Sequence, residues 1–150
     1  MHVHVLNQQH ALAMDLQQIA PLVTEILTFE EEACDEVSVY FVETPTICQL
    51  HQDYFNDPSP TDCISFPLDA EEDGLNYRVL GEVFICPETA IKYAAEHQLD
   101  PYEETTLYLV HALLHLIGYD DIEEEDRQAM REAEQRHLVH LRQLNLLLHP

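Results

Sequence analysis

The sequence predicts a protein of mixed strands and helices, and three observations support this prediction. A strand–helix–strand pattern opens the chain, two apolar strand-like runs lie near its middle, and three helical segments follow. At 150 residues and 46% hydrophobic content, the chain is long enough for one domain with a proper core and too short for two. No internal repeat or low-complexity linker divides it, so we expect a single domain over residues 1–150.

The first third of the chain predicts a parallel strand pair. Residues 2–6 alternate polar and apolar side chains, which indicates a short strand. Asn7 can cap a helix expected over residues 8–29, in which Pro21 introduces a kink or begins a new segment. Residues 37–42 alternate again as a second strand. A strand, a helix and a strand at this separation favour a parallel unit with a right-handed crossover.

The middle of the chain predicts a short helix and then a hairpin. Thr44 and Pro45 have the form of an N-cap and a first helical residue, opening a helix that runs to Tyr54. Residues 63–68 and 79–86 are strand-like and apolar, and the acidic, glycine-containing segment between them favours a turn. We therefore expect these two strands to pair antiparallel.

Three helices are expected in the C-terminal part. The first covers residues 87–98, beginning with a Pro-Glu pair. A second starts at Asp100, with Glu103 returning to the cap, and stops at Gly118. The last helix begins near Ile122. It is expected to dock through its apolar residues Met130, Ala133, Leu138, Leu141 and Leu144.

The charge of the chain argues against a nucleic-acid binder. Its formal net charge is −23, from 29 acidic residues against 6 lysines and arginines. A field of this sign repels polyanions and slows their capture. Most of the arginines lie in the last segment, which is therefore the surface least hostile to RNA: Arg127, Arg131, Arg136 and Arg142.

The cysteine pattern and the hydropathy indicate a cytoplasmic protein. The four cysteines form no C-x-x-C pair, which favours reduced, mostly buried thiols: Cys34, Cys48, Cys63 and Cys86. No apolar run approaches the ~20 residues of a membrane span. The first twenty residues also lack the basic start and cleavage site of a signal peptide. We expect no membrane partner.

The strongest chemical signal is a pair of histidines on the second of these C-terminal helices. His111 and His115 are four residues apart, so both project from one helix face and can grip one metal ion. Asp121, beyond the turn at Gly118, can supply a third ligand and leave a position open for water, as in catalytic zinc sites. Two alternatives stay open: the histidines pack only against neighbours, or Asp121 caps the last helix in a box with Glu124.

Several other metal and hydrolase chemistries are disfavoured. Zincins carry a general-base Glu directly after the first histidine, where this chain has Ala112. The zinc deaminase signature is absent, because Cys86 precedes Pro87 and lacks a second cysteine. Ser65 is not in a G-x-S-x-G elbow, and three glycines do not provide a phosphate-binding loop.

Residues 111–121 resemble the metal motif of the YbeY family of bacterial endoribonucleases and ribosomal RNA maturation factors, His-Gly-x-Leu-His-Leu-x-Gly-Tyr-Asp-His. Residues 61–68 resemble the family's Thr-Asp-Val-Leu-Ser-Phe-Pro block, and residues 81–88 resemble its next strand and helix start. Met130 and Glu134 also fall where the family carries those residue types. Three ordered blocks are far more specific than the histidine pair alone.

The resemblance implies an α+β fold, in which about five helices, one of them a zincin-like metal helix, flank a small mixed sheet of about four strands. It also implies a single-strand-specific endoribonuclease. Its work would be ribosomal RNA maturation and quality control of the small ribosomal subunit, with that subunit and its assembly proteins as partners. DNA is not an expected partner.

A catalytic hypothesis follows from the resemblance. His111, His115 and Asp121 would hold one Zn²⁺, which activates a water for attack on a phosphodiester. A nearby acid, either Asp120 or Asp62, would take the proton, so the catalytic residues are predicted to be His111, His115 and Asp120.

The chain departs from the family pattern at three positions. Asp121 replaces the third histidine, which shifts the ligand set toward harder ions, and Ala112 replaces a glycine. Phe55 stands where the family carries an arginine, so the expected phosphate-binding cation is missing; Arg78 is a possible substitute. Two alternatives therefore remain: a noncatalytic ribosome-assembly factor with a structural metal, or a metal hydrolase for another substrate.

Overall fold

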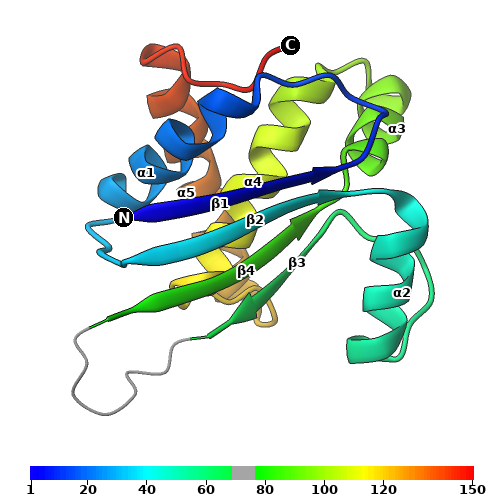
Figure 1. The fold of residues 1–150 in the computed structure, drawn as a ribbon, viewed down its shortest axis with the longest axis horizontal. Coiled ribbons are helices and arrows are strands. Elements are labelled where there is room, and N and C mark those ends of the chain that lie inside the picture. Colours follow the sequence, from blue (N-terminus) through cyan, green and yellow to red (C-terminus); the bar gives the residue numbers. More distant parts are fainter. Residues whose placement is uncertain (69–76) are drawn as a thin grey trace.

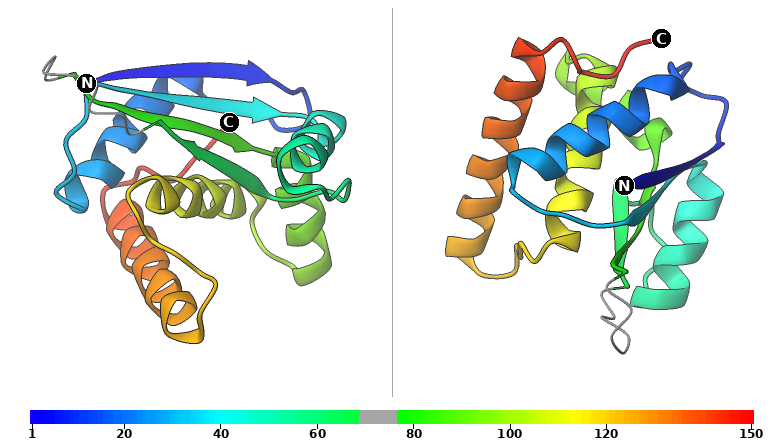
Figure 2. Two further views of the ribbon diagram at one scale, coloured as in Figure 1. Left: turned by 90° about the horizontal axis from the view of Figure 1, so that it is seen from below. Right: turned by 60° about the vertical axis from the view of Figure 1, so that its left-hand side comes forward.

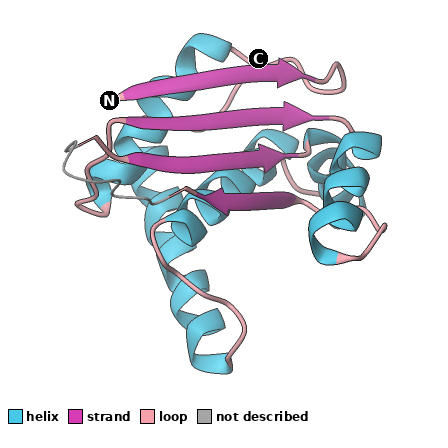
Figure 3. Cartoon of the chain, turned by 60° about the horizontal axis from the view of Figure 1, so that its bottom comes forward, coloured by secondary structure: helices cyan, strands magenta, loops and turns pink. Residues whose placement is uncertain are grey.

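Four strands form one mixed sheet in the order β1–β2–β4–β3. The computed structural model describes residues 1–68 and 77–150. Three strands run parallel and the edge strand β3 runs the opposite way (Figure 3). Their bounds are β1 His2–Gln8, β2 Glu36–Val42, β3 Cys63–Pro67 and β4 Val79–Ile85.

This topology confirms both strand pairings expected from the sequence. β1 and β2 pair in parallel with α1 between them, and β3 and β4 pair antiparallel as a hairpin. The turn expected between the hairpin strands falls mostly on residues 69–76, which lie outside the described residues. With five α-helices around a mixed sheet among the described residues, the fold belongs to the expected α+β class.

The helices cover the sheet unevenly (Figures 1 and 2). α1, α4 and α5 lie on one face of the sheet, and α3 packs beside α4. α2 lies on the opposite face of the sheet, where it packs against β3 in a second, smaller core. The helical bounds are η1 Leu16–Gln18, α1 Ile19–Phe29, α2 Thr44–Phe55, α3 Pro87–His97, α4 Pro101–Leu116 and α5 Glu124–Gln143. Within the described residues, no helix has both the length and the apolar character that crossing a membrane requires.

The expected helix over residues 8–29 is wrong at its start. Asn7 does not cap it, because β1 continues to Gln8 and Asn7 pairs with Phe41 of β2. A loop follows, held by the side chain of Gln9, which accepts from Leu12 N–H and donates to Leu12 C=O at 2.9 Å each. The helix proper begins at residue 19. Pro21 therefore lies in its first turn, where a missing N–H breaks no helical hydrogen bond.

The start of α4 and the packing of α5 are partly as expected. Asp100 caps α4 by accepting from Tyr102 N–H at 2.9 Å, which confirms that start. The predicted hydrogen bond from Glu103 back to the cap is wrong, because the Glu103 carboxylate accepts from Arg142 of α5 instead. Four of the five expected docking residues of α5 are buried. Leu144 is 48% exposed, because α5 ends at Gln143.

α2 begins one residue earlier than the sequence indicated. Its N-cap is Glu43, so Thr44 is the first helical residue rather than the cap. The Thr44 N–H donates to Glu88 Oε1 of α3 at 3.1 Å. Ile47 anchors the helix in a small core whose buried members are Val42, Ile47, Ile64 and Cys86. These contacts hold the N-terminal turn of α2 against α3 and the strands.

α4 is the central helix of the main core. Its inward residues are fully buried, and it packs against β3, β4, α3 and α5. Gly81 of β4 has φ +147°, and a Cβ there would lie 2.4 Å from Phe66 O and 2.9 Å from Leu116 Cδ2. Only glycine fits between β3 and the end of α4. The close packing fixes how far α4 stands from the sheet.

Replacement of Gly81 tests this close approach. Gly81→Ala is expected to reduce the free energy of unfolding by about 3 kcal/mol, because a Cβ would collide with a strand carbonyl. Gly118→Ala is the matched control: φ is also positive, at +108°, but a Cβ would meet nothing within 4 Å. It should cost only about 1 kcal/mol. Chemical denaturation of both variants measures the difference; equal losses would contradict the packing argument.

Candidate metal centre

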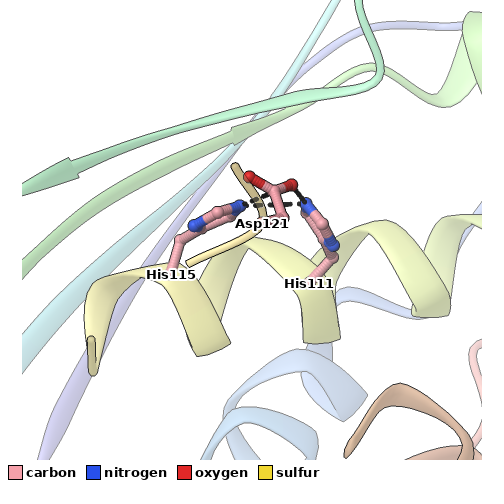
Figure 4. A group of neighbouring side chains, drawn as sticks. All are labelled: His111, His115 and Asp121. Atoms are coloured by element: carbon pink, nitrogen blue, oxygen red, sulfur yellow. Dashed lines mark hydrogen bonds and ion pairs between the residues drawn. The ribbon is translucent and has the colours of Figure 1, made fainter. Parts of the chain in front are cut away.

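The last two turns of α4 present two imidazoles on one face, and a residue from the following turn meets them (Figure 4). The Nε2 atoms of His111 and His115 lie 3.1 Å apart. Asp121 Oδ2 lies 3.5 Å from the first and 3.3 Å from the second. The structure thus brings together all three residues that the sequence suggested as ligands.

A tight helix end returns the chain to the histidines. Gly118 N–H donates to His115 C=O at 3.1 Å and Tyr119 N–H donates to Leu114 C=O at 3.0 Å, while Gly118 takes a positive φ. The alternative role of Asp121 as a cap of the last helix is wrong, because α5 starts at Glu124 with Glu123 as N-cap. The Asp121 side chain is therefore available to the histidines.

The outer nitrogens of both imidazoles are already engaged. His111 Nδ1 donates to Glu134 Oε1 of α5 at 2.8 Å, and His115 Nδ1 donates to Tyr119 C=O at 3.0 Å. Because a carbonyl only accepts, the proton of neutral His115 sits on Nδ1, and a carboxylate favours the same tautomer of His111. Both Nε2 lone pairs consequently point into the space beside Asp121.

This donor set fits a divalent metal ion. One atom from each of the three residues can be chosen so that all lie within 4.8 Å of one another. Two nitrogen lone pairs and a carboxylate oxygen repel each other at such distances unless a cation or a proton lies between them. Two imidazoles and one carboxylate are ligands that zinc and related transition metals accept.

The surrounding charges are negative. Burial acts to lower the pKa of His111, but the hydrogen bond and charge of Glu134, together with Asp62 and Asp121, outweigh it, so the pKa is raised. Burial raises the pKa of the Cys63 thiol well above its usual value, and Asp62 adds to this. Cys63 is thus a neutral thiol rather than a thiolate ligand. The field favours a cation at the histidines.

The three residues open onto a cavity of about 450 Å³. Its floor is joined to α4 by Ser65 of β3, whose Oγ donates to Ala112 C=O at 2.7 Å. None of the described residues that line it is a lysine or arginine. The lining residues are Phe55, Thr61, Asp62, Cys63, Ser65, Pro67, His111, His115 and Asp121.

Two other residues singled out from the sequence lie elsewhere. Asp120 is exposed, accepts from Asp121 N–H at 2.8 Å, and lines a separate hollow with residues of α5. Arg78 donates to Glu32 Oε2 at 2.9 Å and to Ala33 C=O at 2.8 Å, and it is not among the residues that line the cavity. The structure therefore does not bring either side chain to the histidines.

Comparison with known proteins identifies the family. A family model described as endoribonuclease YbeY matches residues 4–142. The chain is 57% identical over 146 residues to the endoribonuclease YbeY of Protochlamydia amoebophila, covering 97% of each protein. The chain belongs to the YbeY family.

Other relatives agree with this placement. The endoribonuclease YbeY of Chlamydia muridarum is 38% identical over 149 residues, covering 99% of this chain and 92% of that protein. The solution structure of TM1509 from Thermotoga maritima has a TM-score of 0.63 and 25% identity, covering 91% of this chain and 87% of that one. The family expected from the sequence blocks is thus confirmed over nearly the whole chain.

In this YbeY family member, the contact between His111 and Glu134 could not be predicted from the sequence. The sequence shows Glu134 only as a matching residue type, because nothing in the spacing of α5 indicates that it contacts His111. It also borders a second hollow of about 550 Å³ that shares Thr61, Asp62 and His111 with the first. The two hollows therefore adjoin along one side of α4.

The Glu134 contact yields a test of the centre. Glu134→Ala is expected to weaken metal binding by about 10- to 100-fold, because His111 loses the partner that fixes its tautomer and orientation. Glu134→Gln can still accept from Nδ1 and should lose less. Chelator competition measures both affinities.

Glu132 is the matched control for this test. It is an exposed acid on the same helix, where it pairs with Gln128, and Glu132→Gln should leave the metal affinity unchanged. A Glu134→Ala protein that binds metal as tightly as the wild type would contradict the role assigned to this carboxylate.

Proposed function

We propose that this protein is a metal-dependent endoribonuclease that cleaves single-stranded RNA and acts in ribosomal RNA maturation. One observation carries the proposal: the Nε2 atoms of two imidazoles and a carboxylate converge at the wall of an open cavity. Membership of a family named for endoribonuclease activity supplies the substrate class. We further propose that residues 1–150 act as one domain.

Zinc is the ion that we propose for the site. Bound there, it would lower the pKa of a water molecule and polarise a phosphate oxygen. His111 and His115 would hold it through Nε2 and Asp121 through a carboxylate oxygen. Glu134 and the Tyr119 carbonyl keep the two imidazoles in the tautomer that ligation needs.

Asp62 is the acid best placed to accept the proton from the attacking water. It lines the cavity, its Oδ1 is held by the Cys63 N–H at 2.8 Å, and its charge acts on His111. Asp120, the other candidate, lines a different hollow. We therefore propose Asp62 rather than Asp120 as the general base.

The acidity of the chain restricts how RNA is held. With a net charge of −23, long-range attraction does not recruit a polyanion. Positive charge for the scissile phosphate would come from the ion itself, because no described cavity residue is a lysine or arginine. We propose the small ribosomal subunit in the cytoplasm as the setting, in maturation and quality control, with neither DNA nor a membrane as partner.

A second candidate function, a noncatalytic assembly factor, is favoured by one surface of α5. A hollow of about 820 Å³ there is lined by residues that include Phe29, Val139, Arg131 and Arg136. This arrangement suits a ribosomal partner. Co-sedimentation with small subunits, without cleavage of RNA by the metal-loaded protein, would favour this function over the nuclease.

Removal of a ligand tests the nuclease directly. His115→Ala is expected to lose stoichiometric metal and at least about 100-fold of the cleavage rate on a single-stranded RNA oligonucleotide. Asp120→Ala is the control, because Asp120 lines a different hollow and not the cavity, and this variant should keep both. Metal analysis and a cleavage assay give the two readouts. Metal-loaded wild-type protein that leaves RNA intact would refute the nuclease assignment.

Exchange of the third ligand tests its chemical effect. Asp121→His would present three imidazoles, which favours zinc over harder ions such as Mn²⁺. We expect the ratio of zinc affinity to manganese affinity to rise by about 10-fold or more. Competition titrations of both proteins measure this ratio, and an unchanged ratio would show that Asp121 is not a ligand.

A further inference from the structure

Phe55 is a large apolar side chain left in solvent at the wall of the cavity. It is 57% exposed and lines the same space as His111, His115 and Asp121. α2 ends directly after it, because Asn56 takes the left-handed conformation with φ 56°. Its ring contact is with His51, at a centroid distance of 5.7 Å and a tilt of 56°, which leaves the ring incompletely covered.

The neighbouring exposed aromatic differs in its surroundings. Tyr54 is 66% exposed but packs edge-on against Phe66 of β3, with centroids 4.7 Å apart, and it is not among the residues that line the cavity. Phe55 and Tyr54 are thus adjacent aromatics of similar exposure, only one of which faces the site. Tyr54 is therefore a matched control for substitutions of Phe55.

The cavity lacks the usual means of gripping a nucleic acid. Its described lining contains the carboxylates of Asp62 and Asp121 and no lysine or arginine. An RNA strand beside the triad would therefore find few ionic contacts. Stacking on an aromatic ring is the other general source of affinity for single strands, and it is insensitive to base identity because every base has a π face.

We propose that Phe55 is a stacking platform for one nucleobase of a single-stranded RNA, next to the phosphodiester at the triad. This inference rests on the proposed function, because it takes RNA as the substrate class. A base within a duplex is already stacked on both sides and is not free to cover the ring. Phe55 therefore contributes to single-strand preference as well as to affinity.

Truncation of the ring is the first test. Phe55→Ala is expected to raise KM for a single-stranded RNA by about 5- to 100-fold, with kcat and metal affinity unchanged, because stacking acts on binding. Phe55→Trp should restore or lower KM. Tyr54→Ala, the matched control, should leave KM within twofold.

An abasic scan separates stacking from a structural role. Single abasic nucleotides are placed at each position near the cleavage site, and KM is measured with wild-type and Phe55→Ala protein. At one position the abasic change should raise KM for the wild type but not for the variant, because the partner of the lost base is already gone. Equal penalties in both proteins at every position would overturn the platform.

Phe55→Arg tests the same point through salt. A guanidinium can bind a phosphate, so the slope of log Kd against log salt concentration should be steeper for this variant by about 0.7 per phosphate contact. Its binding should also tolerate the abasic position. Wild-type binding should depend weakly on salt. A wild-type slope as steep as that of the variant would contradict a stacking contribution.

Binding measured apart from cleavage keeps the two proposals distinct. A short RNA carrying 2-aminopurine at the position found by the scan is mixed with metal-loaded protein in a stopped-flow instrument, and fluorescence is read before cleavage. Stacking should quench the wild-type signal and not that of Phe55→Ala. Quenching without later cleavage would refute the nuclease and support the platform. Cleavage with equal KM for wild type and Phe55→Ala would support the nuclease and refute the platform.

Discussion

The close packing of α4 against β3 and β4 is the constraint on which the site depends. Gly81 lets the end of α4 approach the sheet closely, and Ser65 of β3 donates a hydrogen bond to the carbonyl of Ala112, which lies between the two histidines on α4. One face of α4 is consequently buried while the histidine face is left at the edge of the sheet, beside the hairpin. The same packing makes β3 the opposite wall of the cavity.

Electrostatics give this site two opposing properties. The carboxylates around His111 favour a cation, since Glu134, Asp62 and Asp121 together raise its pKa against the effect of burial. The same carboxylates, in a chain of net charge −23, repel the phosphates of RNA. In the proposed function, a bound ion would supply local positive charge, and the exposed Phe55 ring at the cavity wall would bind bases without adding any.

Local patterns predicted most elements but not where each begins. The alternation of residues 37–42 and the cap at Asp100 are properties of short segments, and both are confirmed within a residue. The predicted start of the first helix is about ten residues too early, because Asn7 and Gln8 extend β1 by pairing with β2, a contact across more than thirty residues. Helical spacing of apolar residues in the loop concealed this.

The sequence by itself determined the family, the class of fold and the histidine pair. The pair follows from local geometry, since a spacing of four residues on a helix places two side chains on one face wherever the helix packs. Only the tertiary structure decided which residues surround the two histidines. It placed Asp121 beside the imidazoles and Asp120 at a separate hollow, brought Glu134 of α5 to His111, and set Phe55 at the cavity wall. These contacts join separate elements, so their geometry comes from the packing of α4, α5 and the sheet rather than from local chain preference.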